Sequence, residues 1–204
     1  TLWVGTYGGG LNRLDAGSDL FHVYRHDPEV KTTIGSDRIL AIYRDKLGTL
    51  WVGTEGGGLN SFDLQRGEFR RYLHDPLDPK SIGSNTAWRI AEDSSGSLWI
   101  GTLDGGLNHL EWIDRNRNDY QFRRFTRKDG LLSDTVYGLE RDGKDTLWIS
   151  SARGLTRFNP LTNTVRHFDR SSGLRDNEFN FGAHFQDETG KLYFGGPHGL
   201  VKFD

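Results

Sequence analysis

Residues 49–60 read TLWVGTEGGGLN, and close variants of this stretch occur five times along the chain. The aromatic anchors of the five copies are Trp3, Trp51, Trp99, Trp148 and Tyr193, separated by 48, 48, 49 and 45 residues. A glycine-rich loop that cradles a phosphate occurs once and begins a helix, whereas here a second strand-like run follows each copy. The stretch therefore predicts a repeated β-hairpin in which glycine supplies backbone angles with positive φ.

Each repeat contains four short runs that have the character of strands. In the second repeat they are ILAIYRD (39–45), LWVGT (50–54), LNSFD (59–63) and FRRY (69–72). No stretch has the periodicity of a helix, and a period of about 48 residues with four strands per unit is typical of a β-propeller. The sequence therefore predicts an all-β propeller of four-stranded antiparallel blades over 1–204, with repeats at approximately 1–48, 49–96, 97–145 and 146–190 and a partial repeat at 191–204.

The strand count indicates an incomplete ring. The second and third strands of the repeat occur five times, whereas the first and fourth occur four times, so the chain holds about four to five blades. We expect an open arc, with a small closed ring of five blades as the alternative. In either case the tryptophan of the second strand is large enough to fill the wedge between neighbouring blades. An open arc exposes blade faces and strand edges, so we also expect self-association.

Composition narrows the function classes. Lys and Arg number 26 against 28 Asp and Glu, which gives no electrostatic reason to expect nucleic acid as a partner. There is no Cys, so disulfides, thiol catalysis and thiolate metal sites are excluded. No run approaches about 18 consecutive apolar residues, so no membrane span is predicted. Because the chain has no Met and opens within a strand, we expect it to be a fragment of a longer protein.

The stretch ILAIYRDKLGTLWVGTEGGGLNSFD (39–63) resembles the two-component regulator propeller repeat. Residues 87–111 and 136–159 have the same pattern of an apolar strand ending in Asp, a polar turn, a Leu-Trp strand and a glycine hairpin. Residues 173–204 resemble the closing repeat of such propellers. The resemblance covers the whole chain, and it implies a ring that usually has seven blades, of which this chain would be an incomplete part.

The same resemblance carries expectations about function. Members of this family form periplasmic sensor regions of hybrid histidine kinases, and sometimes of diguanylate cyclases, that perceive small molecules or oligosaccharides. It therefore implies an extracytoplasmic, non-catalytic module of an inner-membrane receptor, without a cofactor. Its partners would be the ligand, the remaining propeller blades and the other receptor domains.

Candidate ligand-binding positions are those where the frame of the repeat is constant but the side chain differs. Propellers generally bind ligands over the mouth of the channel, where loops of several blades converge, and polar donors beside exposed rings suit a sugar. The glycine hairpins and the first strands supply these positions. We select Arg38, Asn85, Trp88, Asp134, Tyr137, Arg153, Asn180, His184 and His198 as candidate ligand-binding residues.

Alternatives remain for several of these residues and for the function. Each can be an ordinary loop or core residue, and His184 can bond a backbone carbonyl near the axis. The two His-Asp-Pro stretches, 26–28 and 74–76, fit an Asp-initiated turn better than a metal site, and no metal site is predicted. A carbohydrate-active lyase or hydrolase using His184, His198 or an Asp or Glu at the channel mouth, or a protein-docking platform, would use the same scaffold. No nucleophile and base stand at a recognisable spacing, so no catalytic residue is predicted.

Overall fold

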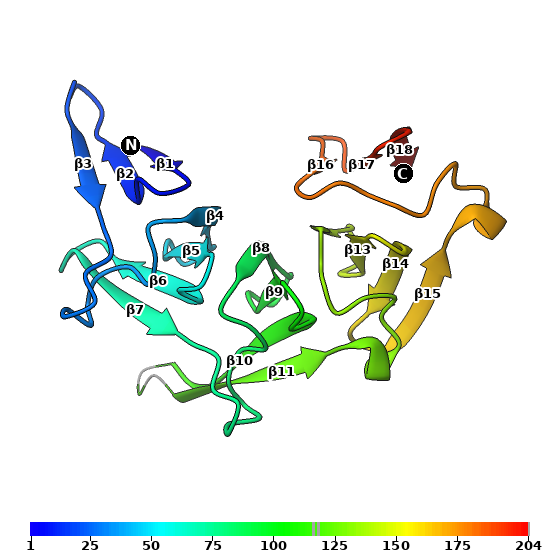
Figure 1. The fold of residues 1–204 in the computed structure, drawn as a ribbon, viewed down its shortest axis with the longest axis horizontal. Coiled ribbons are helices and arrows are strands. Elements are labelled where there is room, and N and C mark those ends of the chain that lie inside the picture. The colour runs from blue at the N-terminus through cyan, green and yellow to red at the C-terminus, as the bar shows by residue number, and fades with distance from the viewer. Residues whose placement is uncertain (116, 118, 204) are drawn as a thin grey trace.

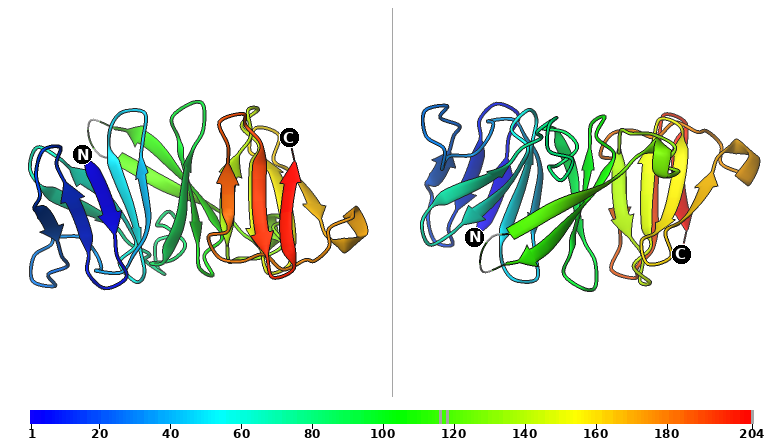
Figure 2. Two further views of the ribbon diagram at one scale, coloured as in Figure 1. Left: turned by 90° about the horizontal axis from the view of Figure 1, so that it is seen from above. Right: turned by 90° about the horizontal axis from the view of Figure 1, so that it is seen from below.

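The computed structural model describes residues 1–115, 117 and 119–203; residues 116, 118 and 204 lie outside the description. The strands form five antiparallel sheets, each following chain order from strand to neighbouring strand. Figure 1 shows the sheets side by side in an arc that does not close, with the first and last sheets at its two ends. Seen edge-on, the strands run across the thickness of the arc (Figure 2). The predicted all-β propeller with an open ring is therefore confirmed.

Three blades have four strands. Blade 2 contains β4 (Ile39–Arg44), β5 (Leu50–Thr54), β6 (Leu59–Asp63) and β7 (Glu68–Tyr72). Blade 3 contains β8 (Ala87–Glu92), β9 (Leu98–Thr102), β10 (Leu107–Asp114) and β11 (Asp119–Phe125). Blade 4 contains β12 (Gly138–Arg141), β13 (Leu147–Ser151), β14 (Gly154–Asn159) and β15 (Thr164–Phe168).

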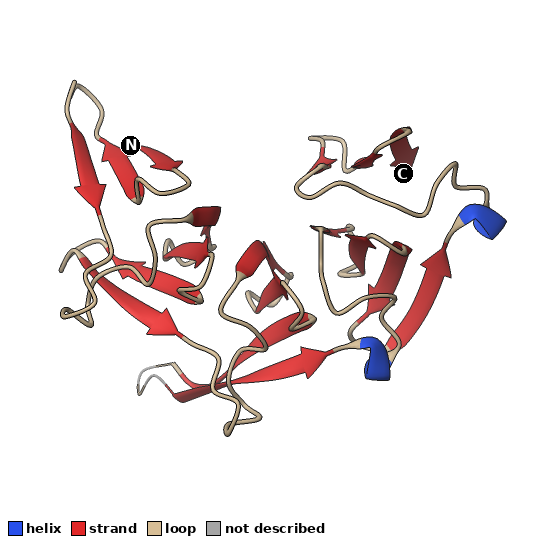
Figure 3. Cartoon of the chain, viewed as in Figure 1, coloured by secondary structure: helices blue, strands red, loops and turns tan. Residues whose placement is uncertain are grey.

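The two end blades have three strands each. Blade 1 contains β1 (Leu2–Gly5), β2 (Leu11–Leu14) and β3 (Phe21–Tyr24). Blade 5 contains β16 (His184–Gln186), β17 (Leu192–Gly196) and β18 (Gly199–Phe203). Two short 3₁₀ turns, η1 (Arg127–Asp129) and η2 (Arg170–Ser172), are the helical pieces of the described chain (Figure 3). They were not predicted, because three residues are too few to show a helical period; Thr126 and Asp169 cap them.

The turns before Trp51, Trp99, Trp148 and Tyr193 are each held by the Asp that precedes the aromatic residue by six positions. One carboxylate oxygen of Asp45 accepts the backbone N–H groups of Leu47 and Thr49, and the other accepts the indole N–H of Trp51 at 2.9 Å. The corresponding side-chain bonds are Asp93–Trp99 at 3.0 Å, Asp142–Trp148 at 3.2 Å and Asp187–Tyr193 at 2.8 Å. This double use of one carboxylate fixes the spacing, because a longer or shorter turn would break one of the two sets of bonds.

The core lies between the blades. Trp51 and Trp99 are each 2% exposed, and each packs against apolar residues of the following blade. Trp3 and Trp148 occupy the same position but are half-buried, against Phe62 and Phe203 respectively. The predicted wedge role of these four tryptophans agrees with the packing.

Loops between blades are tied by a histidine of the loop itself and by an arginine of the following sheet. Nδ1 of His26 bonds the carbonyl oxygen of Ile34 at 2.8 Å, and Arg71 of β7 donates to the carbonyl oxygens of Val30 and Thr33 in the same loop. His74 repeats the first bond with Ile82 at 2.8 Å. The His-Asp-Pro stretches therefore form loop turns. Within the described residues, no group of three or more His, Asp or Glu is arranged to hold a metal ion.

Candidate ligand-binding site at the inner edge

The first strands of neighbouring blades meet at the inner edge of the arc, where β8 contacts β4 and β12, and β12 contacts β16. The register of β8 against β9 shifts between Ala87 and Arg89, which places Trp88 at a β-bulge. Bulges re-aim side chains and are common beside functional sites. The bulge therefore directs the Trp88 indole to the inner edge and not into a wedge between blades.

Three aromatic rings from three blades lie together at this edge. The rings of Trp88 and Phe181 are stacked, with centroids 4.5 Å apart and planes 15° apart. Tyr137 contacts the same Phe181 ring at 3.7 Å between centroids. Phe181 is 47% exposed, so part of this apolar group is accessible to solvent. We call these three residues the inner aromatic group.

Arg89 lies beside this group in an incompletely bonded state. Its Nη1 donates to the carbonyl oxygen of Trp88 at 2.5 Å, while its Nε is buried without a partner. Burial lowers the pKa of Arg89, and the nearby Glu140 carboxylate opposes that shift. Gly182 has a φ of +71°, and a Cβ there would collide with Nη2 of Arg89. Glycine at 182 thus leaves space for the guanidinium of blade 3 to reach blade 5.

Glu140 and His184 join blades 4 and 5. Nδ1 of His184 lies 2.7 Å from Oε1 of Glu140, and both side chains are largely buried. His184 occupies the repeat position held by Ile42, Ile90 and Leu139 in blades 2, 3 and 4. Those three residues are apolar and face the preceding blade. Its partner is therefore a carboxylate of that blade and not the backbone carbonyl considered above.

Three other candidates, Arg38, Asn85 and Asp134, lie on the loop face and already bond neighbouring groups. Arg38 pairs with Glu55 at 2.9 Å and lies over the ring of Tyr7, whose hydroxyl donates to the same carboxylate. That hydrogen bond to Glu55 raises the pKa of Tyr7. Asn85 and Asp134 each accept a backbone N–H at 2.7 Å, from His74 and Arg127 respectively. These side chains already form hydrogen bonds or ion pairs within the protein, so a ligand would have to compete with those bonds.

Three candidates lie on blades 4 and 5 away from those bonds. His198 is exposed, and its Nδ1 lies 2.5 Å from Oδ2 of Asp176. Arg153 and Asn180 are exposed, and in the described part of the chain the Arg153 guanidinium makes no ion pair. All nine candidates remain predictions. The structure brings Trp88 and Tyr137 together against Phe181, places His184 against Glu140 on the first strands, and leaves the others on loops.

Sequence reasoning missed three residues of this edge: Arg89, Glu140 and Phe181. The residues equivalent to Arg89 in the other blades are small: Ala41, Gly138 and Ala183. A charged residue at this position was therefore a visible signal in the sequence. Phe181 occupies the repeat position that Ile39, Ala87 and Val136 hold in the other blades. These residues are all apolar, so an aromatic residue among them is not a distinctive signal.

Comparisons with known proteins agree with this architecture. The two-component regulator propeller family matches residues 33–56 and 81–104. Histidine kinase P4 of Formosa agariphila is 33% identical over 75 residues, which are 37% of this chain and 6% of that protein.

Two solved structures show the range of similar folds. The extracellular domain of a hybrid two-component system from B. thetaiotaomicron superposes with a TM-score of 0.83 at 24% identity, over 99% of this chain and 28% of that one. A gluconolactonase from Xanthomonas campestris gives a TM-score of 0.65 at 14% identity, over 96% of this chain and 65% of the enzyme. The chain thus spans a small part of the signalling proteins that it matches. The two-component regulator propeller model thus matches two stretches of the chain, and the chain folds as an open arc of a β-propeller.

Proposed function

We propose that the chain is a ligand-sensing part of the extracytoplasmic, periplasmic region of a membrane-bound signalling receptor. The support is the match to the two-component regulator propeller repeat and the likeness to a histidine kinase and to an extracellular domain of a hybrid two-component system. The output domain would be a histidine kinase or a diguanylate cyclase. Among the described residues, no helix is long and apolar enough to cross a membrane.

The ligand site is the inner edge of blades 3 to 5. The observation that carries this proposal is the inner aromatic group, because a partly exposed stack beside an incompletely bonded guanidinium has both elements of a sugar site. Rings provide an apolar face for a pyranose, and the buried Nε–H of Arg89 provides a donor that gains most from a ligand acceptor. The ligand is a small molecule or an oligosaccharide.

Sensing requires that the ligand favour one arrangement of the receptor over another. Trp88, Tyr137 and Phe181 come from three different blades, so a ligand that contacts all three bears on how those blades lie relative to one another. The Glu140–His184 bond crosses the same boundary between blades 4 and 5. A ligand at this edge would therefore act on blade packing without any chemical step.

The alternative function is a propeller enzyme, and the Glu140–His184 pair is the observation that favours it, since a carboxylate and an imidazole at 2.7 Å can act as acid and base. A carbohydrate lyase or hydrolase would release products from a glycan, whereas a sensor would bind it unchanged. A docking platform for other proteins would do neither.

The test is a panel of small oligosaccharides and monosaccharides, scored by thermal stabilisation and by product analysis of the same samples. We expect stabilisation without turnover, lost in Trp88→Ala and in Phe181→Ala. Trp112→Ala is the matched control, because Trp112 is a half-buried tryptophan that contacts Tyr120 on β11. Products that disappear in His184→Ala would support the enzyme instead, and no stabilisation with any compound would contradict the sensor.

A further inference from the structure

The third and fourth strands of blade 4 place two arginines directly opposite each other. Arg157 of β14 and Arg166 of β15 are partners in the register of the two strands. Residues directly opposite on antiparallel strands share one face of the sheet, and like charges at such positions repel each other. The pairing therefore brings two positive charges together, which by itself destabilises the sheet.

Both guanidinium groups lie over aromatic rings. That of Arg157 is 5.6 Å from the centroid of the Trp148 ring, and that of Arg166 is 4.8 Å from the centroid of Phe168. The two rings are themselves stacked, with centroids 5.4 Å apart. Cation–π contacts orient a guanidinium without using its N–H groups as donors. The Nε of Arg157 is enclosed without a partner, so a ligand would meet its terminal nitrogens.

No carboxylate neutralises this pair. Within residues 1–115, 117 and 119–203, neither Arg157 nor Arg166 forms an ion pair. The Asp142 carboxylate lies in the turn before Trp148, but its oxygens accept two backbone N–H groups and the indole N–H of Trp148. The two arginines therefore keep their full charge and their free donors.

Blade 1 has an acid at the place where blade 4 lacks one. There the opposed residues are Arg13 and His22, and Asp15 lies 2.9 Å from the arginine and 3.8 Å from the histidine. The position of Asp15 is held by Asp63 in blade 2, by Glu111 in blade 3 and by Asn159 in blade 4. Blade 4 thus combines two opposed arginines with a neutral amide in place of the acid.

A pocket of about 260 Å³ lies beside the two arginines at the turn of this hairpin. Its lining consists of Thr146, Arg157, Asn159, Thr164, Val165 and Arg166. Guanidinium, hydroxyl and amide groups all supply hydrogen-bond donors, and no acid is among the described residues that line the pocket. We call this the arginine pocket, and its chemistry is that of an anion site.

The equivalent pocket of blade 2 has nearly the same volume, about 250 Å³, but a balanced charge. Asp63 and Glu68 line it at the two positions that Asn159 and Thr164 hold in the arginine pocket. Its lining comes from blade 2 alone, although the complete blade 3 lies beside it. The pocket therefore belongs to the hairpin itself, and two residue exchanges give blade 4 its net positive charge.

We propose that the arginine pocket binds a phosphate or sulfate group. Two guanidinium forks on neighbouring strands reach an anion from two directions, and a tetrahedral anion has more oxygens to accept their N–H groups than a carboxylate has. Binding also relieves the repulsion between Arg157 and Arg166. The pocket lies on the outer strands of blade 4, separate from the inner aromatic group, and does not depend on the proposed sensing function.

The experiment is calorimetric titration of the whole chain with sodium phosphate at about pH 7.5, where phosphate carries nearly two charges, with sodium chloride holding the ionic strength constant. We expect saturable binding with a Kd on the order of 1 mM, similar binding of sulfate, and binding of acetate at least about fivefold weaker. No saturable binding of phosphate, or acetate binding as tight as phosphate binding, overturns the proposal.

Methyl phosphate distinguishes the two sources of such a group. Binding as tight as that of inorganic phosphate supports an ester as the ligand, and loss of binding supports the free anion. Both results agree with an oxyanion site, because the donors that hold the oxygens are the same.

Three variants assign the binding to the pocket. Asn159→Asp restores the acid of the other blades, and Asp63 shows that an aspartate makes the same two turn bonds. We expect it to weaken phosphate binding about tenfold while the melting temperature is kept, and Arg166→Gln to have a similar effect on binding. Arg70→Gln, at the equivalent position of the balanced blade 2 pocket, is the matched control and should leave binding unchanged. Wild-type affinity in both Asn159→Asp and Arg166→Gln, or an equal loss in Arg70→Gln, overturns the site.

Discussion

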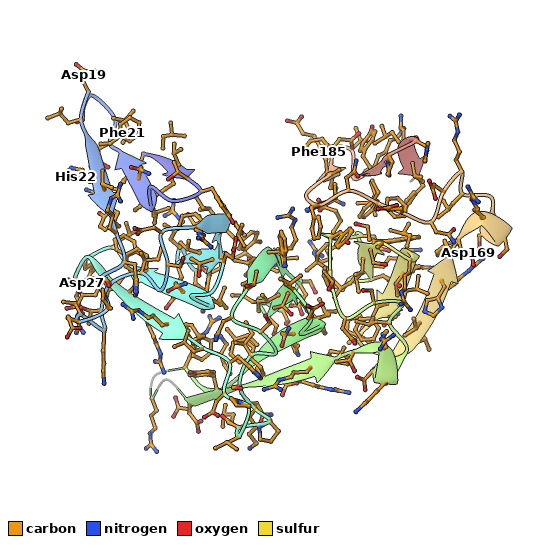
Figure 4. All side chains as sticks on the ribbon, in the orientation of Figure 1. Asp19, Phe21, His22, Asp27, Asp169 and Phe185 are labelled. Carbon is orange, nitrogen blue, oxygen red and sulfur yellow. The ribbon has the colours of Figure 1, made fainter. Side chains whose placement is uncertain are left out.

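The wedge between blades 1 and 2 and the free face of blade 1 are built from the same residue types. Val52 of β5 is fully buried beneath blade 1, whereas Val4, at the same position of β1, is 36% exposed. The other end of the arc repeats this difference: Leu59 is fully buried and its equivalent Leu200 is 64% exposed. Phe21 and Phe185 lie at these two ends (Figure 4). One repeat sequence is thus core or surface according to whether a neighbouring blade covers it.

The largest effect should come from removing a wedge tryptophan under a full neighbour. We expect Trp51→Ala to lower the free energy of unfolding by about 3–5 kcal/mol, because it leaves a cavity and frees Asp45 from its indole bond. Trp3→Ala, in a half-buried copy of the same position, should cost about half of that or less. Urea denaturation of both variants measures the difference, and equal losses would contradict the view that the neighbour determines the contribution.

The turn carboxylate should have the next largest effect. Asp93→Ala removes the acceptor of four hydrogen bonds at once, from the backbone N–H groups of Ser95 and Ser97, the Ser95 hydroxyl and the Trp99 indole. We expect it to lower the free energy of unfolding by about 1–3 kcal/mol, since the indole N–H loses its partner in a mostly buried place. Asp63→Ala, which removes a loop carboxylate that bonds two exposed backbone N–H groups, is the control. A loss no larger than the control's would show that the repeated spacing is not set by this bond.

The exposed apolar faces of blades 1 and 5 should affect the self-association of the protein. We expect the protein to self-associate, because apolar rows that are core elsewhere are exposed on blades 1 and 5. A Phe21→Lys, Leu200→Lys double variant should shift light scattering toward the monomer with little loss of stability. The control is Lys191→Arg, which keeps the charge. A clean monomer for the unmodified chain would count against this expectation.

The smallest effect should appear in the pH dependence of protein stability. Burial lowers the pKa of His109 below its ordinary value of 6.5. As pH falls, the imidazole of the unfolded chain is therefore protonated before that of the folded chain. The stability that the neutral, buried His109 contributes is lost as pH falls below about 6.5. We expect His109→Gln to lose less melting temperature than the unmodified chain between about pH 7.5 and about pH 5. His22→Gln, at an exposed position of β3, should keep the full dependence. An identical loss in all three would refute a buried neutral His109.

The fold could be predicted because its main signals lie within one repeat. The Asp-to-Trp spacing, the glycine hairpin and the alternating strands each follow from local turn chemistry and recur, so five copies reinforce one interpretation. The candidate site was predicted only in part. Trp88, Tyr137 and His184 were visible as departures from the repeat, but departures such as Asn85 and Asp134 proved to bond loop backbone.

By itself, the sequence determined the strands, their order in each sheet and the aromatic wedge, because these depend on residues a few positions apart. Only the tertiary structure decided which variable side chains meet. The stack of Trp88 on Phe181, the reach of Arg89 to Gly182 and the Glu140–His184 bond all join different blades. Their meeting depends on the rotation from each blade to the next, and that rotation comes from the packing of whole sheets.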